Sequence, residues 1–547
     1  MRLDRTTLEQ AGGMSVAALL DQRVSETPDQ VGVEATSAAL TFADWGRGAD
    51  AVAGWLRAEL GELRGERILL WMSNDDATLF ACALHASFKL GAIAVALDDR
   101  STAAETKRII TETEPRAILA SRQVAENLGP QGLGALRLLD WMPAPDRSLI
   151  HLWPVNRRGV SGTPSSCDPR DVAGNGSVAH EGRAEDDAFI AFTSGSTGRP
   201  KGAIWSQGAV VQYAERATRT IYSLPRGGRD LGPDDVLQSP IPLYTAASLI
   251  ENLYSAAFSG CRLLYEGRRF DPARSERRMH EQGATVYNGA PPHFAMMCDL
   301  PETEPPPNLQ AMTSGGSAFA APLYKRMRAR WPGVGIANWY GLNESGTGQT
   351  LNFGDDIERA PEAIGRPIPP TEIRIVDANG SDLHDGDEGE LWMRAPGQMR
   401  EYFRNPEQTA LRLRDGWLMT GDQAIRDETG LVHVVGRNEE RINRGGFKFY
   451  PAEIESVLLE HDDVREAAVV GVSHPVLGQE AVAFVVPTEG ATVDETALAR
   501  HCREHVAANK APARVVVREE LPRNAYGKVV RRELRSEFEA AAGSATS

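Results

Sequence analysis

The order of hydrophobic and polar positions in the first hundred residues predicts alternating helices and strands. Residues 41–60 place apolar side chains at helical spacing. The apolar run at 66–72 predicts a buried strand, residues 77–90 a helix, and the run G-A-I-A-V-A-L at 91–97 a second strand. This β-α-β succession predicts a parallel sheet that is covered by helices.

The pattern of the second half is different. Short runs of alternating polarity at 372–377 and 389–394, separated by turn-forming residues, predict antiparallel strands of a small β-barrel. After Arg437 the chain returns to an α/β pattern. The helices expected there cover 451–460 and 494–508, and the strands cover 466–473, 480–486 and 514–518.

The fold class that follows is α/β, in two domains. We expect a large N-terminal domain of residues 1–439, with parallel αβ-layered sheets and the small barrel, and a small C-terminal α/β domain of residues 440–547. Residues 143–186 are rich in Pro, Gly, Ser and Asp, which predicts an exposed, partly disordered insertion. Residues 540–547 predict a frayed tail.

Composition narrows the class of protein. The 547 residues carry a formal net charge of −16, which argues against a nucleic-acid partner, because a phosphate backbone binds to a basic surface. The five cysteines form no C-x-x-C pair, so we expect free thiols in a reducing cytoplasm and no zinc site. The apolar stretch 79–97 is interrupted by His85 and Lys89, and the N-terminus has no apolar leader pattern, so no membrane association is expected.

The most informative segment, residues 193–202, reads T-S-G-S-T-G-R-P-K-G. Glycines allow a tight turn that exposes backbone N–H groups, and successive N–H groups form an anion-binding nest. Three hydroxyl-bearing side chains in the segment add donors, and Lys201 adds a positive charge. Because an apolar strand is expected just before it, at 189–192, the segment predicts a loop that holds a polyphosphate.

The spacing excludes two common phosphate-binding motifs. The segment does not fit G-x-x-x-x-G-K-[ST], because Pro200 lies five residues after Gly195 and Gly202 follows Lys201, and it contains no G-x-G-x-x-G. A flexible Ser/Gly linker would explain neither the lysine nor the preceding apolar run.

The segment instead resembles the phosphate-binding loop of the adenylate-forming superfamily. This superfamily includes acyl- and aryl-CoA synthetases, adenylation domains of peptide synthetases, and firefly luciferase. The resemblance implies ATP-binding roles for Thr193, Ser194, Gly195, Ser196, Thr197, Gly198 and Lys201.

Residues 338–348, N-W-Y-G-L-N-E-S-G-T-G, resemble the Y-G-x-T-E element of the same superfamily. From the residues alone, an aromatic ring beside a glycine can stack on a purine, and a carboxylate can hold Mg²⁺. The resemblance implies that Trp339, Tyr340 and Gly341 contact ATP and that Glu344 serves Mg²⁺. Asn343 stands where the superfamily usually has threonine, and its amide can donate to the α-phosphate instead.

Two further segments resemble nucleotide-binding elements of the superfamily. The S-G-G-S run at 314–317 resembles the glycine pair on the other face of the adenine. The run T-G-D at 420–422 places a carboxylate where it can accept both ribose hydroxyls. The resemblance implies that ATP is bound by Gly315, Gly316, Ser317, Asp422 and Arg437.

Residues 436–455 resemble the hinge and first strand of the superfamily's mobile C-terminal domain. The hinge position, usually Asp or Lys, falls on Glu440. Arg444, Gly445 and Gly446 match the stretch that faces the thiol tunnel in CoA ligases.

A lysine near the C-terminus completes the set of motifs. Residues 522–528, P-R-N-A-Y-G-K, match the superfamily's P-x-x-x-x-G-K. By itself such a lysine is ordinarily a solvated charge. The resemblance implies that Lys528 is catalytic in adenylation, together with Glu344.

The acid pocket is less clearly defined by the sequence. Where the superfamily often has a His and a Gly after P-L-[FY], this chain has Thr245 and Ser248, and Glu251 and Asn252 follow on an otherwise apolar helix. These polar groups either recognise a polar substituent of the acid or lie at the surface. The residues assigned to the pocket are Tyr244, Thr245, Ser248 and Asn288.

The resemblance covers nearly the whole chain and implies a two-step reaction. ATP, with Mg²⁺, activates a carboxylic acid as an acyl-adenylate with release of pyrophosphate, and the acyl group then passes to the thiol of CoA. Two alternatives share the first step: an amide synthetase that transfers the acyl group to an amine, and a ligase that loads a carrier-protein pantetheine. The F-D-x-S-type element of amino-acid-activating domains is absent, so an aryl or otherwise functionalised acid, or a fatty acid, is expected rather than an α-amino acid.

Overall fold

The β-α-β unit predicted near the N-terminus is present. The computed structural model describes residues 13–36, 38–121, 150–156, 159–160, 165–167, 181–193, 201–488, 490–491, 493–523 and 528–544. Strands β3 (Arg67–Trp71) and β4 (Ile93–Ala96) are parallel neighbours, and helix α4 (Ala77–Lys89) connects them. Helix α3 (Phe42–Leu60) begins where expected, because the Thr41 hydroxyl accepts a hydrogen bond from the Asp44 backbone N–H at 3.0 Å.

Within the described residues, two mixed nine-stranded sheets form the larger part of the molecule. The first contains, in spatial order, β17 (Arg366–Pro367), β16 (Thr347–Phe353), β15 (Gly335–Leu342), β14 (Ala311–Ser314), β13 (Val286–Gly289), β11 (Val236–Ser239), β12 (Arg262–Tyr265), β1 (Val31–Glu34) and β2 (Ala39–Thr41). The second contains β20 (Glu401–Tyr402), β10 (Lys201–Ser206), β9 (Asp187–Thr193), β4, β3, β5 (Ala117–Ser121), β6 (Ile150–Asn156) and β7 (Gly159–Val160), and β8 (Ser165–Cys167) pairs with β6.

Helices fill the space between the sheets and cover the outer face of the first one. One continuous apolar core joins both sheets through α3, α4, α2 (Val16–Glu26), α8 (Gln207–Arg219), α9 (Ser255–Ser259) and the π-helix η4 (Ala247–Tyr254). A second core lies under α10 (Pro272–Gln282), α11 (Pro291–Cys298), α12 (Ala321–Arg330) and α13 (Asp355–Arg359). Strand β15 serves both cores because successive side chains point to opposite faces: Ala337 joins the first core and Ile336 the second.

The small barrel predicted from the alternating runs is present as a half-barrel. It is an open antiparallel sheet built from β18 (Glu372–Val376), β19 (Gly389–Arg394), β22 (Trp417–Arg426), β21 (Leu413–Arg414) and β23 (Val432–Arg437). Helix α14 (Pro406–Arg412) packs against it. The first two strands correspond to the predicted runs, and buried residues lie on both of their faces: Ile375 and Leu391 join the main core, whereas Val376 and Trp392 cluster with Met419.

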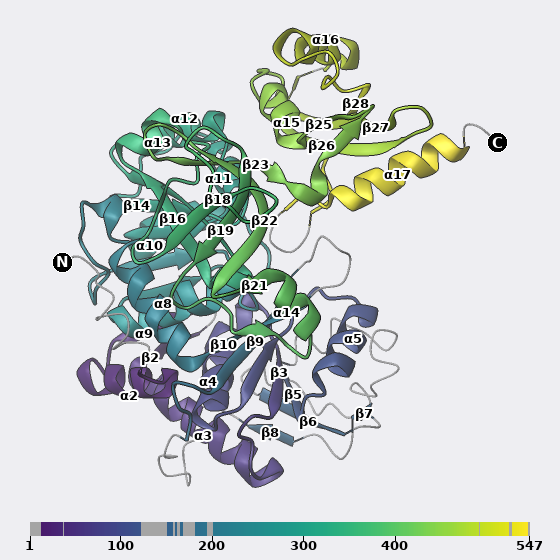
Figure 1. Ribbon diagram of the computed structural model, residues 1–547. Helices are drawn as coiled ribbons and strands as arrows, with labels where there is room; N and C mark the ends of the chain where they lie inside the picture. Colours follow the sequence, from purple (N-terminus) through teal and green to yellow (C-terminus); the bar gives the residue numbers. More distant parts are fainter. Residues whose placement is uncertain are drawn as a thin grey trace.

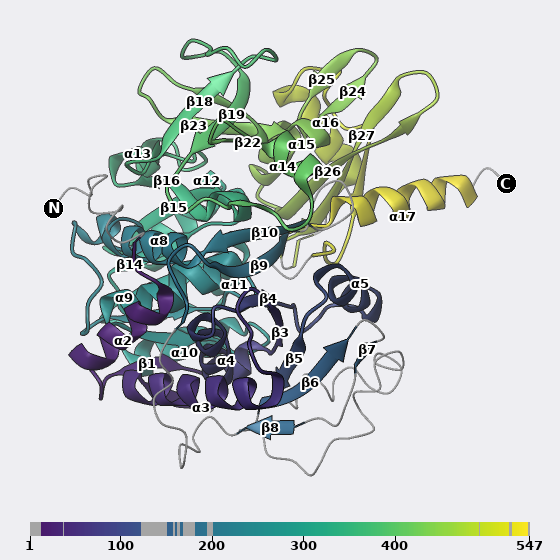
Figure 2. The ribbon, with the colours of Figure 1, turned by 60° about the horizontal axis from the view of Figure 1, so that its bottom comes forward.

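The chain after Arg437 forms a separate α/β lobe. Figures 1 and 2 show its helices and strands gathered on one side of the molecule, next to the half-barrel. Its elements are β24 (Ile442–Arg444), β25 (Phe447–Phe449), α15 (Pro451–Leu459), β26 (Val464–His474), β27 (Gly478–Pro487), α16 (Glu495–His505), β28 (Arg514–Val517) and α17 (Arg531–Ser544). All five elements predicted in this part are present, and the lobe has apolar cores of its own.

Two segments differ from what composition predicted. Part of the expected insertion at 143–186 joins the second sheet, because β6 pairs antiparallel with β5 from Ala117↔Pro154 to Ser121↔Ile150; much of the rest of this stretch lies outside the described residues. Residues 540–544, expected to be a frayed tail, continue helix α17. Among the helices that the structure describes, none has the length and apolar character needed to span a bilayer.

Candidate active site

Several of the predicted nucleotide-binding residues that the structure describes meet where the first sheet and the half-barrel adjoin. Tyr340, near the end of β15, donates a hydrogen bond from its hydroxyl to the carboxylate of Asp422 on β22. The two residues are 82 positions apart in the chain. Burial, and the negative charge of Asp422, raise the pKa of the Tyr340 hydroxyl well above its usual value, so this group stays a donor.

Asp422 also pairs with the predicted arginine. Asp422 and Arg437 are register partners on β22 and β23, and the Arg437 Nε lies 2.9 Å from Asp422 Oδ1. The Asp422 side chain is almost fully buried, and its charge raises the pKa of Arg437. A buried carboxylate held by an arginine is a stable acceptor for neighbouring hydroxyl groups.

Two glycines in the predicted adenine region allow close packing that no side chain would permit. A Cβ atom added to Gly315 would lie 2.2 Å from the Trp339 ring, and one added to Gly341 would lie 1.5 Å from the Thr347 carbonyl oxygen. Gly316, next in the chain, has a φ of +84°, which glycine adopts readily. Ser317 follows in the same turn after β14.

Glu344 is held by a tyrosine that the sequence motifs did not reveal. It lies in the short 3₁₀ turn η5 (Asn343–Ser345), and the Tyr402 hydroxyl donates a 2.6 Å hydrogen bond to Glu344 Oε1. The ammonium of Lys201 lies 5.5 Å from the centre of the Tyr402 ring. Burial, and the nearby charge of Arg412, lower the pKa of Lys201.

The implied Mg²⁺ fits this arrangement. In the part of the chain that the structure describes, no cluster of three or more His, Cys, Asp or Glu could bind a metal ion unaided. Mg²⁺ usually takes one or two carboxylates together with substrate phosphates, so the single carboxylate of Glu344 suits it. When bound, Mg²⁺ would neutralise phosphate charge at this carboxylate.

Lys528 reaches this site from the C-terminal lobe. Although its side chain keeps an exposed surface, the surrounding protein atoms desolvate the ammonium group and lower its pKa to about 8, and the charge of Arg437 contributes. The carboxylates of Asp422, Glu344 and Glu440 act in the opposite direction. The lysine therefore lies within electrostatic range of both the predicted ribose and the predicted metal carboxylates.

The predicted hinge residue lies between the half-barrel and the lobe, and the predicted thiol-tunnel residues lie within the lobe, at the end of β24 and in the turn that follows. Glu440 ends the 3₁₀ turn η6 (Asn438–Glu440), and a nitrogen of the Arg531 guanidinium lies 3.5 Å from its carboxylate. Arg444 donates to the carbonyl oxygens of residues 509 and 511 at 3.2 Å. Gly445 and Gly446, which follow it, both have positive φ.

The residues assigned to the acid pocket are mostly buried and hydrogen-bonded within the protein. Ser248 and the Tyr265 hydroxyl lie 2.8 Å apart, and the Thr245 hydroxyl accepts from the Ser248 N–H at 3.0 Å. Asn288 donates to the side-chain oxygen of Asn252 at 2.8 Å. Tyr244 lies nearer the surface and accepts from Arg100 at 3.1 Å. The polar residues of η4 thus do not lie at the surface.

The predicted phosphate loop is described only at its ends. Thr193 ends β9 and Lys201 begins β10, and the two residues are register partners in an antiparallel pair. The pairing brings the two ends of the loop side by side. The residues between them lie outside the described part of the chain; the predicted ones are Ser194, Gly195, Ser196, Thr197 and Gly198.

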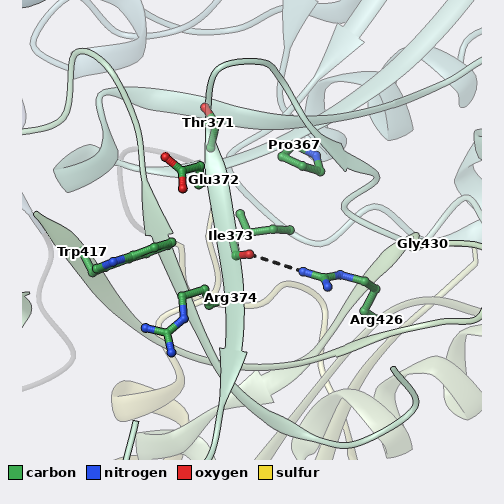
Figure 3. Close-up of a pocket in the computed structure, with 8 residues that line it drawn as sticks. All are labelled: Pro367, Thr371, Glu372, Ile373, Arg374, Trp417, Arg426 and Gly430. Carbon is green, nitrogen blue, oxygen red and sulfur yellow. Dashed lines mark hydrogen bonds between the residues drawn. The ribbon is translucent and has the colours of Figure 1, made fainter. Parts of the chain in front are cut away.

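A pocket on the half-barrel does not coincide with this site. It has a volume of about 450 Å³, and Figure 3 shows its lining, including Trp417, Arg374 and Arg426, which donates to the Ile373 carbonyl oxygen at 3.3 Å. None of its lining residues is a predicted site residue. The candidate site is therefore a cluster of charged and hydrogen-bonded residues at a different place from this pocket.

Comparison with known proteins assigns the chain to a family. Residues 20–403 match the family described as AMP-binding enzyme, and residues 453–528 match the AMP-binding enzyme C-terminal domain. A 2-succinylbenzoate–CoA ligase of Geobacillus kaustophilus is 30% identical over 94% of this chain and 96% of its own length. A long-chain-fatty-acid–CoA ligase of Salmonella typhimurium is 28% identical over 96% and 94%.

A solved structure has the same fold over nearly its full length. The ATP-bound MatB from Rhodopseudomonas palustris is 26% identical, with a TM-score of 0.81, covering 96% of this chain and 99% of that one. The two family matches cover residues 20–403 and 453–528, most of the chain. The chain belongs to the family of AMP-binding enzymes.

Proposed function

We propose that this enzyme activates a carboxylic acid with ATP and transfers the acyl group to CoA. In the first step a carboxylate oxygen attacks the α-phosphate, which forms the acyl-adenylate and releases pyrophosphate. In the second step the CoA sulfur attacks the acyl carbon, which forms the thioester and releases AMP. The observation that carries the proposal is the approach of Lys528, from the C-terminal lobe, to Asp422 and Glu344.

Charge neutralisation is the main requirement of the first step, because two anions must meet. Lys528 would bridge the substrate carboxylate and the α-phosphate. Lys201 and the 193–202 loop would take up charge on the departing pyrophosphate, and Glu344 would hold Mg²⁺ beside it. Positioning, without a covalent enzyme intermediate, is sufficient for such a step.

The nucleoside would be held by the residues around Tyr340. Asp422 and Arg437 would bind the ribose. Tyr340 would pack on one face of the adenine and the glycine pair Gly315 and Gly316 on the other, with the Trp339 ring supporting Gly315 from behind. The hydrogen bond from Tyr340 to Asp422 supports this assignment, since it couples the two halves of the nucleoside site.

For the second step we propose that the lobe of residues 440–547 turns about Glu440 relative to the domain of residues 1–439. This rotation would withdraw Lys528 and bring Arg444, Gly445 and Gly446 toward the acyl group. The names of the relatives, all CoA ligases in the comparisons above, favour a CoA thiol over an amine or a carrier protein as the acceptor.

Product analysis tests the proposal. Purified enzyme with ATP and Mg²⁺ is incubated with a panel of aryl and aliphatic acids, with CoA and with amines in separate reactions, and the products are identified by mass spectrometry. We expect AMP, pyrophosphate and a CoA thioester, and no amide. Pyrophosphate release with an amide and no thioester would support an amide synthetase instead.

A further inference from the structure

An arginine that belongs to none of the sequence motifs lies beside the candidate site. Arg412 is the last residue of α14, which packs against β20, β21 and β22. Strand β20 carries Tyr402, which bonds the predicted metal carboxylate, and β22 carries Asp422 of the predicted ribose site. The Arg412 side chain is 24% exposed, so a ligand can reach it.

A glycine allows the guanidinium of Arg412 to lie against the turn that precedes Asp422. Nη1 donates to the carbonyl oxygen of Met419 at 3.1 Å. Gly421 has a φ of +76°, and a Cβ added to it would lie 2.6 Å from this Nη1. A side chain at residue 421 would therefore push the guanidinium away from the site.

The electrostatics place Arg412 close to the predicted phosphate and metal residues. Burial, followed by the charge of Arg412, lowers the pKa of the Lys201 ammonium. Burial and the charge of Glu344 raise the pKa of the Tyr402 hydroxyl, and Arg412 acts in the opposite direction. Two cations, one at the end of the predicted phosphate loop and one on α14, thus repel each other, and an anion that contacts both relieves this repulsion.

The carboxylate partner of Arg412 leaves most of its donors available. Nη2 lies 3.6 Å from Oε1 of Glu439, which is longer than a hydrogen bond. Among the described residues, the bond to the Met419 carbonyl oxygen is the only hydrogen bond made by the five N–H groups of this guanidinium. An arginine with unused donors suits phosphate oxygens, which it binds through two parallel hydrogen bonds.

Resting on the proposed function, we propose that Arg412 binds the β- and γ-phosphates of ATP, which leave as pyrophosphate. In the empty enzyme it pairs with Glu439, and the phosphates displace that carboxylate. When the substrate carboxylate attacks, the bond between the α-phosphorus and the bridging oxygen breaks and its electron pair stays on the pyrophosphate. Arg412 and Lys201 share the added negative charge.

The competing explanation is structural. Glu439 belongs to the turn η6, directly before the predicted hinge residue Glu440, so the ion pair could simply fasten this turn to α14. The two roles differ in sign. A fastening is lost when either partner is removed, whereas a carboxylate that competes with phosphate for Arg412 weakens phosphate binding as long as it is present.

Substitutions at both ends of the ion pair distinguish the two roles. The KM for ATP and the inhibition constant of inorganic pyrophosphate are measured from AMP formation, and the Kd for AMP by calorimetry. We expect Arg412→Gln to raise the first two constants roughly tenfold or more, because hydrogen bonds to a charged group are lost. The Kd for AMP, which lacks the two phosphates, should stay unchanged. Glu439→Gln should lower the inhibition constant of pyrophosphate, and this variant tests the inference independently of the arginine variants.

A double variant and a control complete the test. Glu439 is also within electrostatic range of Lys201, so its effect is measured again in the Arg412→Gln background, where we expect it to be clearly smaller. Arg412→Lys keeps the charge and should recover part of the affinity for pyrophosphate. Arg394→Gln removes an arginine that pairs with Glu372 at 2.7 Å elsewhere on the half-barrel, and should leave all three constants unchanged.

Three results would overturn the inference while leaving acid activation intact. The first is an unchanged inhibition constant of pyrophosphate in Arg412→Gln, and the second is weaker pyrophosphate binding in both single variants, which would indicate the structural fastening. The third is a rise confined to the KM for CoA, which would assign Arg412 to the phosphates of CoA. If the native enzyme forms no AMP with any acid, the proposed function itself fails, and this inference fails with it.

Discussion

At the scale of the residue, the site is a set of opposed charges from distant parts of the chain. Asp422 forms an ion pair with Arg437, whereas Glu344 accepts a hydrogen bond from the Tyr402 hydroxyl and has no such arginine partner among the described residues. Lys528 is the cation contributed by the C-terminal lobe. In the proposed first step, its charge is the one that the substrate carboxylate and the α-phosphate would share.

Removing that charge should slow adenylation strongly. One preorganised charge of this kind contributes about 3–4 kcal/mol to transition-state stabilisation, so Lys528→Ala should lower the rate of pyrophosphate release by 100-fold or more. The control is Lys510→Ala, which removes a lysine of the same lobe that pairs with Glu453. Near-normal pyrophosphate release by Lys528→Ala would exclude this role for the lysine.

The pH dependence should report the same lysine. Its pKa is lowered to about 8, and the protonated form is the one that binds anions. Raising the pH through 8 removes the charge, so kcat/KM for ATP, which reflects the free enzyme, should be level at pH values about one unit or more below 8 and fall as the pH rises through 8. Lys528→Arg keeps its positive charge to a much higher pH, so the fall in kcat/KM above about pH 8 should disappear in this variant. If kcat/KM of that variant still falls above about pH 8, the titrating group is not Lys528.

Tyr402 is expected to act as a positioning residue for Glu344. A hydrogen bond to a charged group contributes about 1.5–3 kcal/mol. Tyr402→Phe should therefore reduce kcat/KM for pyrophosphate release about tenfold and raise the Mg²⁺ concentration needed for half-maximal rate. Tyr324→Phe on α12 serves as control, because it removes a tyrosine hydroxyl outside the site. A loss of rate with an unchanged Mg²⁺ requirement would mean that Tyr402 acts by another route.

At the scale of the element, the β15–β16 hairpin determines the geometry of the site. Its register shifts between Tyr340 and Gly341, and the 3₁₀ turn at its end presents Glu344. Bulges of this kind re-aim side chains near functional sites. The close contact between Gly341 and the Thr347 carbonyl oxygen makes this irregularity possible.

Filling that contact should destabilise the protein. Gly341→Ala would place a Cβ 1.5 Å from a backbone oxygen, and overpacking typically costs about 1–3 kcal/mol. The melting temperature should fall by several degrees and ATP binding should weaken. Gly232→Ala, where a Cβ meets nothing within 4 Å, should leave both nearly unchanged. Equal melting temperatures for the two variants would show that the hairpin accommodates the added Cβ without a loss of stability.

At the scale of the whole molecule, the lobe and the larger domain meet with Lys528 directed to the nucleotide residues. The arrangement suits the first step of the proposed reaction, and for the second step we have proposed that the lobe moves. Glu440 lies in the short turn between β23 and β24, where a change in two backbone angles would rotate the lobe.

Restricting this turn should affect only the second step. Glu440→Pro fixes φ and should leave pyrophosphate release close to normal while thioester formation falls sharply. Glu440→Ala removes the carboxylate but keeps the backbone free, so we expect it to form more thioester than Glu440→Pro and to release pyrophosphate at a similar rate. Equal losses in both steps for the proline variant would contradict the hinge assignment.

Much of the fold could be predicted because the relevant signals are local. The helix at 41–60 carries its own N-cap, and the strands of the half-barrel and lobe carry alternating or continuous apolar runs. Strand β6 was missed, because its pairing with β5 depends on a neighbour some 30 residues away. Composition indicates which conformation a segment prefers in isolation. An exposed sheet edge can still pair with the segment and make it a strand.

The sequence alone therefore determined the family and the order of the nucleotide motifs, since each motif is a contiguous run whose chemistry is set by its own residues. Only the tertiary structure decided which groups act together. Tyr402 meets Glu344 across 58 residues, and Tyr213 meets Glu251 across 38. The physical reason is that a hydrogen bond or a desolvated charge depends on distance and burial in space, and packing of the whole chain sets both.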